Sequence, residues 1–353
     1  MELLHYRNFY REDFEDLNSD LKTEIEDQNK NKFASDEHIN IVIKEREVLE
    51  QLKLLERARW NTYPRCDENY YPIFEVLIVD HCNLNCGYCN HWSNIAEKHF
   101  YDHDQLMKDL ARLKELYGHY SIKLMGGEPM IHPRIRDIIK NASQFVDEVQ
   151  ILTNGLTLIR DVKKKDYSML DLFEEYRVKL EITRYPILDY TDLLKKLKED
   201  YTMFVDYEVE LGNSESVRDT MQIHGVNING IEDWQNRHLV CGNSNVTINM
   251  REGKIYACPF KACLNIFSKK YGLEGEVEAT EEDYIDIYKA KSKEEIAMFT
   301  TKGTPACRFC TGDTFFYGPK NHPWRKTTKM VTEWIDEEAI EESKRTYKFN
   351  LLD

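Results

Sequence analysis

The chain has 353 residues, of which 41% are hydrophobic and 31% charged, a balance typical of a globular protein with a buried core. Its formal net charge of −15 disfavours nucleic acid or an anionic membrane as partner, because both are bound by basic surfaces. The sequence has no apolar run long enough to span a bilayer and no visible secretory signal, so we expect a cytoplasmic protein.

The first 71 residues are rich in charged side chains and are predicted to form a helical N-terminal extension. Val48, Leu52 and Leu55 recur at helical spacing, which indicates a helix over about residues 38–59. We expect this extension to pack on the main domain rather than to form a module of its own.

Residues 72–210 alternate between strand and helix patterns. Strands are predicted from apolar runs at 74–80, 121–125, 146–152, 178–182 and 202–209. Helices are predicted from periodic apolar residues at 103–117, 133–145, 168–176 and 191–199. This alternation predicts an α/β fold with parallel strands and right-handed crossovers, arranged as an open sheet or as a barrel.

Beyond residue 211 the alternation stops, and residues 211–320 are predicted to form an irregular α+β domain. A hairpin is expected in this domain, with its turn at 251–253. The last segment, 321–353, is predicted to be helical around 328–345, where Met330, Val331, Trp334 and Ile335 recur at amphipathic spacing.

Nine cysteines are spread over the chain: Cys66, Cys82, Cys86, Cys89, Cys241, Cys258, Cys263, Cys307 and Cys310. A reducing cytoplasm disfavours structural disulfides, so clustered thiols there indicate metal or redox chemistry. The odd number and the tight spacing of three of them fit metal ligation better than disulfide bonds.

Cys82, Cys86 and Cys89 form a C-x3-C-x2-C loop directly after the first predicted strand. A four-iron cluster takes four ligands, so three thiolates would leave one iron open to a small molecule. The alternative is a zinc site in which His81 or His91 is the fourth ligand. The spacing taken alone leaves both open.

The loop resembles the signature of the radical S-adenosylmethionine (radical SAM) superfamily. Three further passages at predicted strand ends resemble it as well: MGGEP at 125–129, LTNG at 152–155 and ITRYP at 182–186, the last with threonine where serine is usual. The resemblance implies a partial (β/α) barrel over 72–210. It also implies that the residues binding S-adenosylmethionine are Tyr88, Gly126, Gly127, Glu128, Thr153, Asn154, Thr183 and Arg184.

These implied contacts agree with elementary fold physics. Parallel βα folds place ligands at the C-terminal ends of their strands, where all four passages lie. Gly126 and Gly127 lack side chains, so the backbone there is able to approach a ligand closely.

The remaining cysteines include a second set with metal-site spacing. Cys241 and Cys258 flank the predicted hairpin, and Cys307 and Cys310 follow as C-x2-C, so four thiolates are able to meet around zinc or iron. The pattern resembles the twitch domain, the SPASM-related domain of radical SAM enzymes that carries a single auxiliary cluster. The resemblance implies a second [4Fe–4S] cluster with four protein ligands. Cys66 has no assigned role.

The resemblance implies an oxidoreductase that reductively cleaves S-adenosylmethionine and abstracts hydrogen from a substrate. A flavodoxin or ferredoxin-type donor is the expected source of electrons. We expect a small polar substrate, such as a sugar, nucleotide-sugar or aminocyclitol, and a two-electron oxidation as in a dehydrogenase. The alternatives are a radical epimerase with Cys263 as hydrogen donor, a peptide-modifying maturase, and a zinc-binding protein without enzyme activity.

Overall fold

The computed structural model describes residues 53–67, 70–201, 217–222, 225–244, 247–312, 321–335 and 337–343. Glu56–Lys348 forms one compact unit, which contains all the elements below. Of the other unit, Met1–Leu55 with Phe349–Asp353, the structure describes only residues 53–55, which are helical. Most of the predicted N-terminal helix and the predicted strand at 202–209 lie outside the described residues.

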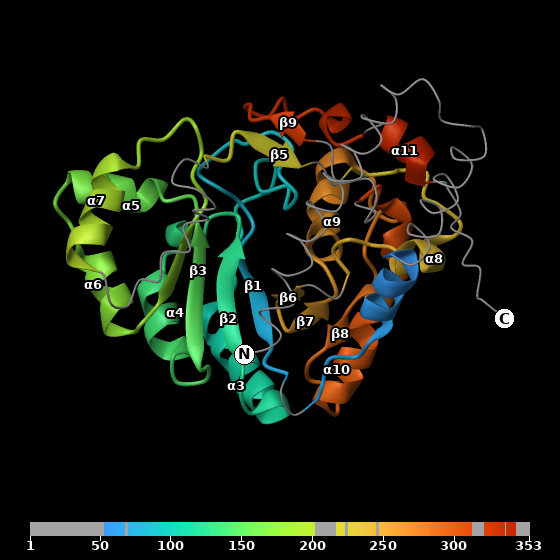
Figure 1. The fold of residues 1–353 in the computed structure, drawn as a ribbon, viewed down its shortest axis with the longest axis horizontal. Coiled ribbons are helices and arrows are strands. Elements are labelled where there is room, and N and C mark those ends of the chain that lie inside the picture. Colours follow the sequence, from blue (N-terminus) through green and yellow to red (C-terminus); the bar gives the residue numbers. More distant parts are fainter. Residues whose placement is uncertain are drawn as a thin grey trace, which may run out of the picture. The chain divides into compact units, whose positions relative to one another are not determined.

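A seven-stranded sheet in the order β4-β3-β2-β1-β6-β7-β8 is the centre of the unit (Figure 1). The strands are β1 (Ile73–Val79), β2 (Ser121–Gly126), β3 (Glu148–Thr153), β4 (Lys179–Ile182), β6 (Ile248–Arg251), β7 (Lys254–Tyr256) and β8 (Ile285–Asp286). The first five strands in that order run parallel, and β7 and β8 pair antiparallel at the end of the sheet. Two short strands, β5 (Thr220–Gln222) and β9 (Asn321–Pro323), form a separate antiparallel pair.

The helices follow the strands along the chain. The α-helices are α3 (His103–Tyr117), α4 (Ile135–Ala142), α5 (Leu156–Lys163), α6 (Ser168–Glu175), α7 (Thr191–Asp200), α8 (Trp234–Leu239), α9 (Pro259–Tyr271), α10 (Lys293–Thr300) and α11 (Glu337–Ser343). Short 3-10 turns are η1 (Pro129–Ile131), η2 (Glu281–Asp283), η3 (Pro305–Phe309) and η4 (Val331–Glu333). No helix in these described ranges is both long and apolar enough to cross a membrane.

Helix α3 shows why the sequence forms these elements. Asp102 caps its first turn by accepting a hydrogen bond from the Gln105 backbone N–H at 2.9 Å. Gly118 ends it with a φ of 72°, a conformation that favours glycine. Between these ends, Leu106, Leu110 and Leu113 recur on one face and are fully buried.

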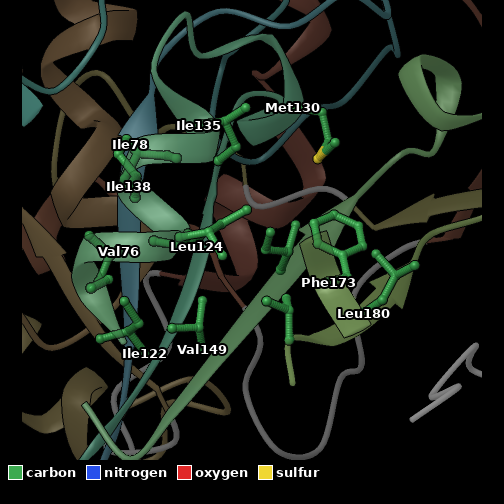
Figure 2. Packing of buried hydrophobic residues seen from close by; sticks show 14 of the residues in the cluster. Val76, Ile78, Ile122, Leu124, Met130, Ile135, Ile138, Val149, Phe173 and Leu180 are labelled. Atoms are coloured by element: carbon green, nitrogen blue, oxygen red, sulfur yellow. The ribbon is translucent and has the colours of Figure 1, made fainter. Parts of the chain in front are cut away.

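The main core lies between the parallel strands and their crossover helices. Val76 of β1, Leu124 of β2 and Val149 of β3 meet Ile138 of α4 and Phe173 of α6 in one buried cluster (Figure 2). Burial of such side chains stabilises the sheet by about 1.5–3 kcal/mol each. The core therefore fixes the strand ends from which the functional residues project.

The predicted α/β fold with a parallel sheet is confirmed, and four of its five predicted strands lie within one or two residues of β1–β4. The predicted hairpin is also present as β6 and β7, but β6 pairs in parallel with β1 and so belongs to the main sheet. Helix α5 was not predicted. The helix predicted over 328–345 is wrong as one continuous element, because the structure has the turn η4 and then the short helix α11.

Candidate active site

A cavity of about 150 Å³ lies at the C-terminal ends of the parallel strands. Its lining combines the cysteine loop after β1 with the residues that follow β2, β3 and β4: Cys82, Leu84, Cys86, Cys89, Asn90, His91, Ser93, Asn94, Met125, Gly126, Gly127, Glu128, Leu152, Thr153, Asn154, Thr183, Tyr185, Arg218 and Met221. Three predicted cluster ligands and six of the eight predicted cofactor contacts thus share one cavity. Tyr88 and Arg184 do not line it.

The cysteine loop is held in place by backbone hydrogen bonds. The Cys82 N–H donates to the Ser93 carbonyl at 3.2 Å, and the Leu84 N–H donates to the Cys82 Sγ at 3.3 Å. The Asn94 side chain donates to the Cys86 carbonyl at 2.5 Å. These contacts close the loop on itself, so that its three thiols face one cavity.

Two thiols of this loop, Cys82 and Cys86, have raised pKa values. Burial raises the pKa of Cys82 well above its ordinary value, and neighbouring thiols raise it further. Burial also raises the pKa of Cys86 to about 11. Because a bound metal deprotonates a coordinating thiol, such cysteines become thiolates when a metal takes the place of the proton.

Gly126 and Gly127 are required for a reason that the sequence did not reveal. A Cβ on Gly127 would stand 1.9 Å from the His81 carbonyl oxygen, and a Cβ on Gly126 would stand 2.3 Å from the Val79 carbonyl oxygen. The Gly127 N–H donates to the same Val79 oxygen at 2.6 Å. Because neither glycine has a Cβ, the end of β2 packs directly against the backbone that leads into the cysteine loop.

Glu128 joins the end of β2 to the end of β3. It is 1% exposed, and one carboxylate oxygen accepts hydrogen bonds from the Thr153 hydroxyl at 2.5 Å and the Met130 N–H at 3.1 Å. The other oxygen accepts from the Asn154 N–H at 2.9 Å. Burial raises the pKa of Glu128 to about 7, although these hydrogen bonds oppose the shift.

Asn154 connects this carboxylate to the cysteine loop. Its side-chain nitrogen donates to the Asn83 side-chain oxygen at 2.8 Å and lies 3.6 Å from the Cys82 Sγ. Its own oxygen accepts from the N–H of Leu156, the first residue of α5, at 2.9 Å. Asn154 thus fixes the distance between the third strand and the first cysteine.

Tyr88 is held by the C-terminal segment rather than by the cavity. Its φ is 59°, and its hydroxyl accepts hydrogen bonds from the Arg325 guanidinium at 2.9 and 3.2 Å. Its backbone N–H donates to the carboxylate of Glu333 at 2.9 Å. The prediction from sequence had no signal for Arg325 or Glu333, because they lie more than 230 residues further along the chain.

Arg184 lies just outside the cavity, but its neighbourhood supplies unpredicted lining residues. The Arg184 carbonyl accepts a hydrogen bond from the Arg218 N–H at 2.7 Å, and Arg218 lines the cavity with Tyr185. Tyr185 follows directly after two predicted positions, so the strand-end rule alone could have found it. Arg218 could not be found in this way, because it belongs to the irregular region after the last predicted strand.

Cys263 does not line the cavity and is 3% exposed. It packs in a buried cluster with Trp92, Phe260 and Phe267. Burial raises its pKa far above the ordinary value, and both Cys89 and Cys258 add to that effect. The thiol is therefore inside the protein core, where it is affected by one cysteine of each set.

The second cysteine set converges within the C-terminal half. Cys258 caps α9, Cys307 lies in η3, and Cys310 ends that turn. Burial raises the pKa of Cys258 to about 12, and the neighbouring thiols of Cys307 and Cys241 raise it further. Burial raises the pKa of Cys310 in the same way, and the other three thiols raise it further.

A backbone N–H group and the side chains of Arg57 and Asn61 hold this second set. The Gly312 N–H donates to the Cys310 Sγ at 3.2 Å. The Cys241 carbonyl accepts from the Arg57 Nε at 2.8 Å and from the Asn61 side chain at 3.0 Å. Within the described ranges, no three His, Cys, Asp or Glu side chains lie close enough to share one metal ion. A four-iron cluster binds its cysteines through different irons, so its ligands stand further apart than those of a single ion.

Comparison with known families matches residues 76–199 to the Radical SAM superfamily. Residues 76–199 are therefore a radical SAM domain. The radical SAM family implies S-adenosylmethionine and a [4Fe–4S] cluster as cofactors.

Relatives of this radical SAM enzyme include GTP 3′,8-cyclases. The enzyme of Clostridium botulinum (strain Okra / Type B1) is 27% identical over 256 residues, which are 67% of this chain and 75% of the relative. The enzyme of Clostridium perfringens (strain SM101 / Type A) is 32% identical over 126 residues, which are 32% of this chain and 38% of the relative. Among solved structures, BtrN in complex with AdoMet and 2-DOIA covers 71% of this chain and 99% of its own, with 15% identity and a TM-score of 0.42.

Proposed function

We propose that this radical SAM enzyme holds two four-iron clusters and removes two electrons from a small polar substrate. The observation that carries the proposal is the shared cavity, in which the cysteine triad meets Glu128, Asn154 and Thr183. Three thiolates leave one iron of a four-iron cluster without a protein ligand, and the strand ends supply polar groups around that position. When bound, S-adenosylmethionine and its cluster supply a radical that takes hydrogen from the substrate, and an auxiliary cluster supplies a one-electron acceptor.

The residues of the cavity then act by positioning. Gly126 and Gly127 keep the β2 end against the cysteine loop, so the loop and the cofactor contacts have a fixed spacing. Glu128 and Asn154 tie the same β2 end to β3 and to Cys82. Preorganised polar groups of this kind orient a ligand without rearrangement at the moment of reaction.

The second cysteine set supports the auxiliary cluster. The thiols of Cys241, Cys258 and Cys307 all raise the pKa of Cys310, which supports a grouping of these four cysteines. Four protein ligands would leave no iron for substrate, which favours electron transfer as the role of this cluster. The substrate would lose one hydrogen atom and then one electron and one proton, so the product would be two hydrogens lighter.

The lining of the cavity supports a small polar substrate. Asn90, His91, Tyr185 and Arg218 add amide, imidazole, phenol and guanidinium groups to the same space. Arg218 provides a cation suited to an anionic substituent, such as a phosphate. A sugar, a nucleotide-sugar or an aminocyclitol has the hydroxyl groups that such a lining is able to bind.

A redox-neutral ring closure is the second candidate function. It is favoured by the 27% identity to a GTP 3′,8-cyclase over two thirds of the chain. The epimerase alternative gains no support, because the Cys263 thiol is buried outside the cavity. For the peptide-modifying alternative, the described residues add no specific support.

The test is turnover by the anaerobically reconstituted full chain with S-adenosylmethionine and a reductant such as flavodoxin. We expect 5′-deoxyadenosine from wild type and from Cys66→Ala, whose cysteine lies outside both sets, and none from Cys82→Ala/Cys86→Ala/Cys89→Ala. Polyols, aminocyclitols, nucleotide-sugars and GTP are then compared as substrates. A product two hydrogens lighter supports oxidation, whereas conversion of GTP to an isomer of equal mass supports cyclisation.

A further inference from the structure

Lys261 is a buried cation in the first turn of α9. It is 2% exposed, and its Nζ donates a hydrogen bond to the Thr304 hydroxyl at 3.0 Å. Among the residues that the structure describes, no carboxylate oxygen lies within 4.0 Å of this nitrogen. A buried ammonium group with only a neutral partner is costly, so a compensating negative charge is expected nearby.

Asp283 and the second cysteine set, once its thiols are thiolates, are the groups near Lys261 that supply negative charge. Burial lowers the pKa of Lys261, but the thiols of Cys307, Cys258 and Cys241 and the carboxylate of Asp283 outweigh burial and raise it. The oxygens of Asp283 already accept hydrogen bonds from the backbone N–H groups of Ala306 at 2.8 Å and Thr280 at 2.9 Å. Asp283 is thus held by backbone donors, and the thiols, when they become thiolates, are further anions that the ammonium stabilises.

The place of Lys261 in the fold joins two of the ligand segments. It lies three residues after Cys258, which caps α9. Its hydrogen-bond partner Thr304 caps η3, and the Thr304 carbonyl accepts from the Cys307 N–H at 2.9 Å. The Lys261 side chain thus connects α9, which begins after Cys258, to η3, which contains Cys307 and ends at Cys310.

We propose that Lys261 is the charge partner of the auxiliary cluster and raises its reduction potential. This inference rests on the proposed function, since it needs the cluster at Cys241, Cys258, Cys307 and Cys310. A cluster with four thiolate ligands is anionic and becomes more negative when it accepts an electron. A cation beside it in a low-dielectric interior stabilises the reduced state more than the oxidised state. Lys261 would thereby make the cluster a better acceptor for an electron from the substrate.

The experiment is an anaerobic redox titration of the full chain, followed by electron paramagnetic resonance. Cys82→Ala/Cys86→Ala/Cys89→Ala is the background, so that only the auxiliary cluster gives a signal. Adding Lys261→Met should make reduction at least about tenfold less favourable, which is a shift of about 59 mV to more negative potential for one electron. Lys269→Met is the matched control, because Lys269 lies on the same helix with a 60% exposed side chain. It should leave the potential almost unchanged.

The outcomes separate the inference from the proposed function. No iron in the triple-cysteine background would overturn the auxiliary cluster itself. A loaded cluster whose potential is the same with and without Lys261→Met would overturn only the role of Lys261. If Lys261→Met loses iron, Lys261→Gln and Lys261→Arg are compared. Iron retained by Lys261→Arg but not by Lys261→Gln supports the requirement for a positive charge. Iron lost by both variants overturns that requirement. A loaded Gln variant must show the negative shift.

Discussion

The buried carboxylate of Glu333 accepts a hydrogen bond from the backbone N–H of Tyr88, 2.9 Å away in space and 245 residues away in sequence. Tyr88 lies between the second and third cysteines of the triad. The same carboxylate accepts hydrogen bonds from the Thr328 N–H at 2.7 Å and the Thr327 hydroxyl at 3.1 Å. The C-terminal segment is therefore part of the structure that shapes the cysteine loop.

Glu333→Gln should weaken this loop. An amide in place of the carboxylate turns an NH2 group toward backbone donors, and each buried donor left unpaired costs about 1–3 kcal/mol. We expect a lower free energy of unfolding and less iron bound by the triad, measured by urea denaturation and iron analysis. Glu337→Gln, an exposed position on α11, is the control and should change neither. Equal iron content in both variants would show that the loop keeps its shape without this contact.

Gly127→Ala should disturb the cysteine loop itself. The new Cβ would stand 1.9 Å from the His81 carbonyl oxygen and 2.9 Å from that of Asp80, and these backbone atoms leave it no room. We therefore expect loss of iron as well as of S-adenosylmethionine binding, measured by iron analysis and calorimetry. The sequence alone predicts instead that a side chain at Gly127 crowds only the cofactor.

A matched control for this glycine is Gly272→Ala at the C-terminus of α9. Gly272 has a φ of 68°, but a Cβ at this position would meet no heavy atom within 4 Å. About 1 kcal/mol of backbone strain is therefore expected there, without loss of iron. Normal iron content in Gly127→Ala would mean that β2 is able to shift away from β1.

Glu128 should give the metal-free protein a specific pH dependence. Its folded pKa of about 7 lies above its ordinary value of 4.5, so the folded state binds this proton more tightly than the unfolded state. The contribution to stability is complete below about pH 4.5 and is lost as the pH rises through about 7. Urea denaturation of wild type and Glu128→Gln at pH 5 to 8 should show wild type losing its advantage as pH rises. Parallel curves for the two proteins would contradict the raised pKa.

Cys263→Ala should leave turnover intact. The thiol is 3% exposed and packs in the core outside the cavity, so its loss should cost only about 1 kcal/mol of stability. Once a substrate is known, reaction in deuterated water measures the outcome. Oxidised product at undiminished turnover agrees with a dehydrogenase. Loss of turnover in the variant, together with one solvent deuterium in a redox-neutral wild-type product, would instead establish an epimerase.

The sequence predicted the parts of the site that depend on local pattern. Apolar periodicity located β1–β4, and the resemblance to radical SAM motifs named Glu128, Asn154 and Thr183, which line one cavity in the structure. The sequence did not predict contacts between distant segments, such as Glu333 with Tyr88 or β6 with β1. Those depend on tertiary packing, which leaves no periodic trace in a single sequence. The buried charge of Lys261 is of the same kind, because nothing in its helix distinguishes it from the exposed Lys269.

The most direct test of two clusters is iron content per chain after anaerobic reconstitution. Two four-iron clusters predict about eight irons in wild type and in Cys66→Ala. Replacing either Cys82, Cys86 and Cys89 or Cys241, Cys258, Cys307 and Cys310 by alanine should leave about four, and only the first change should abolish 5′-deoxyadenosine formation. About four irons in wild type, with no further loss when the second cysteine set is replaced, would contradict the account.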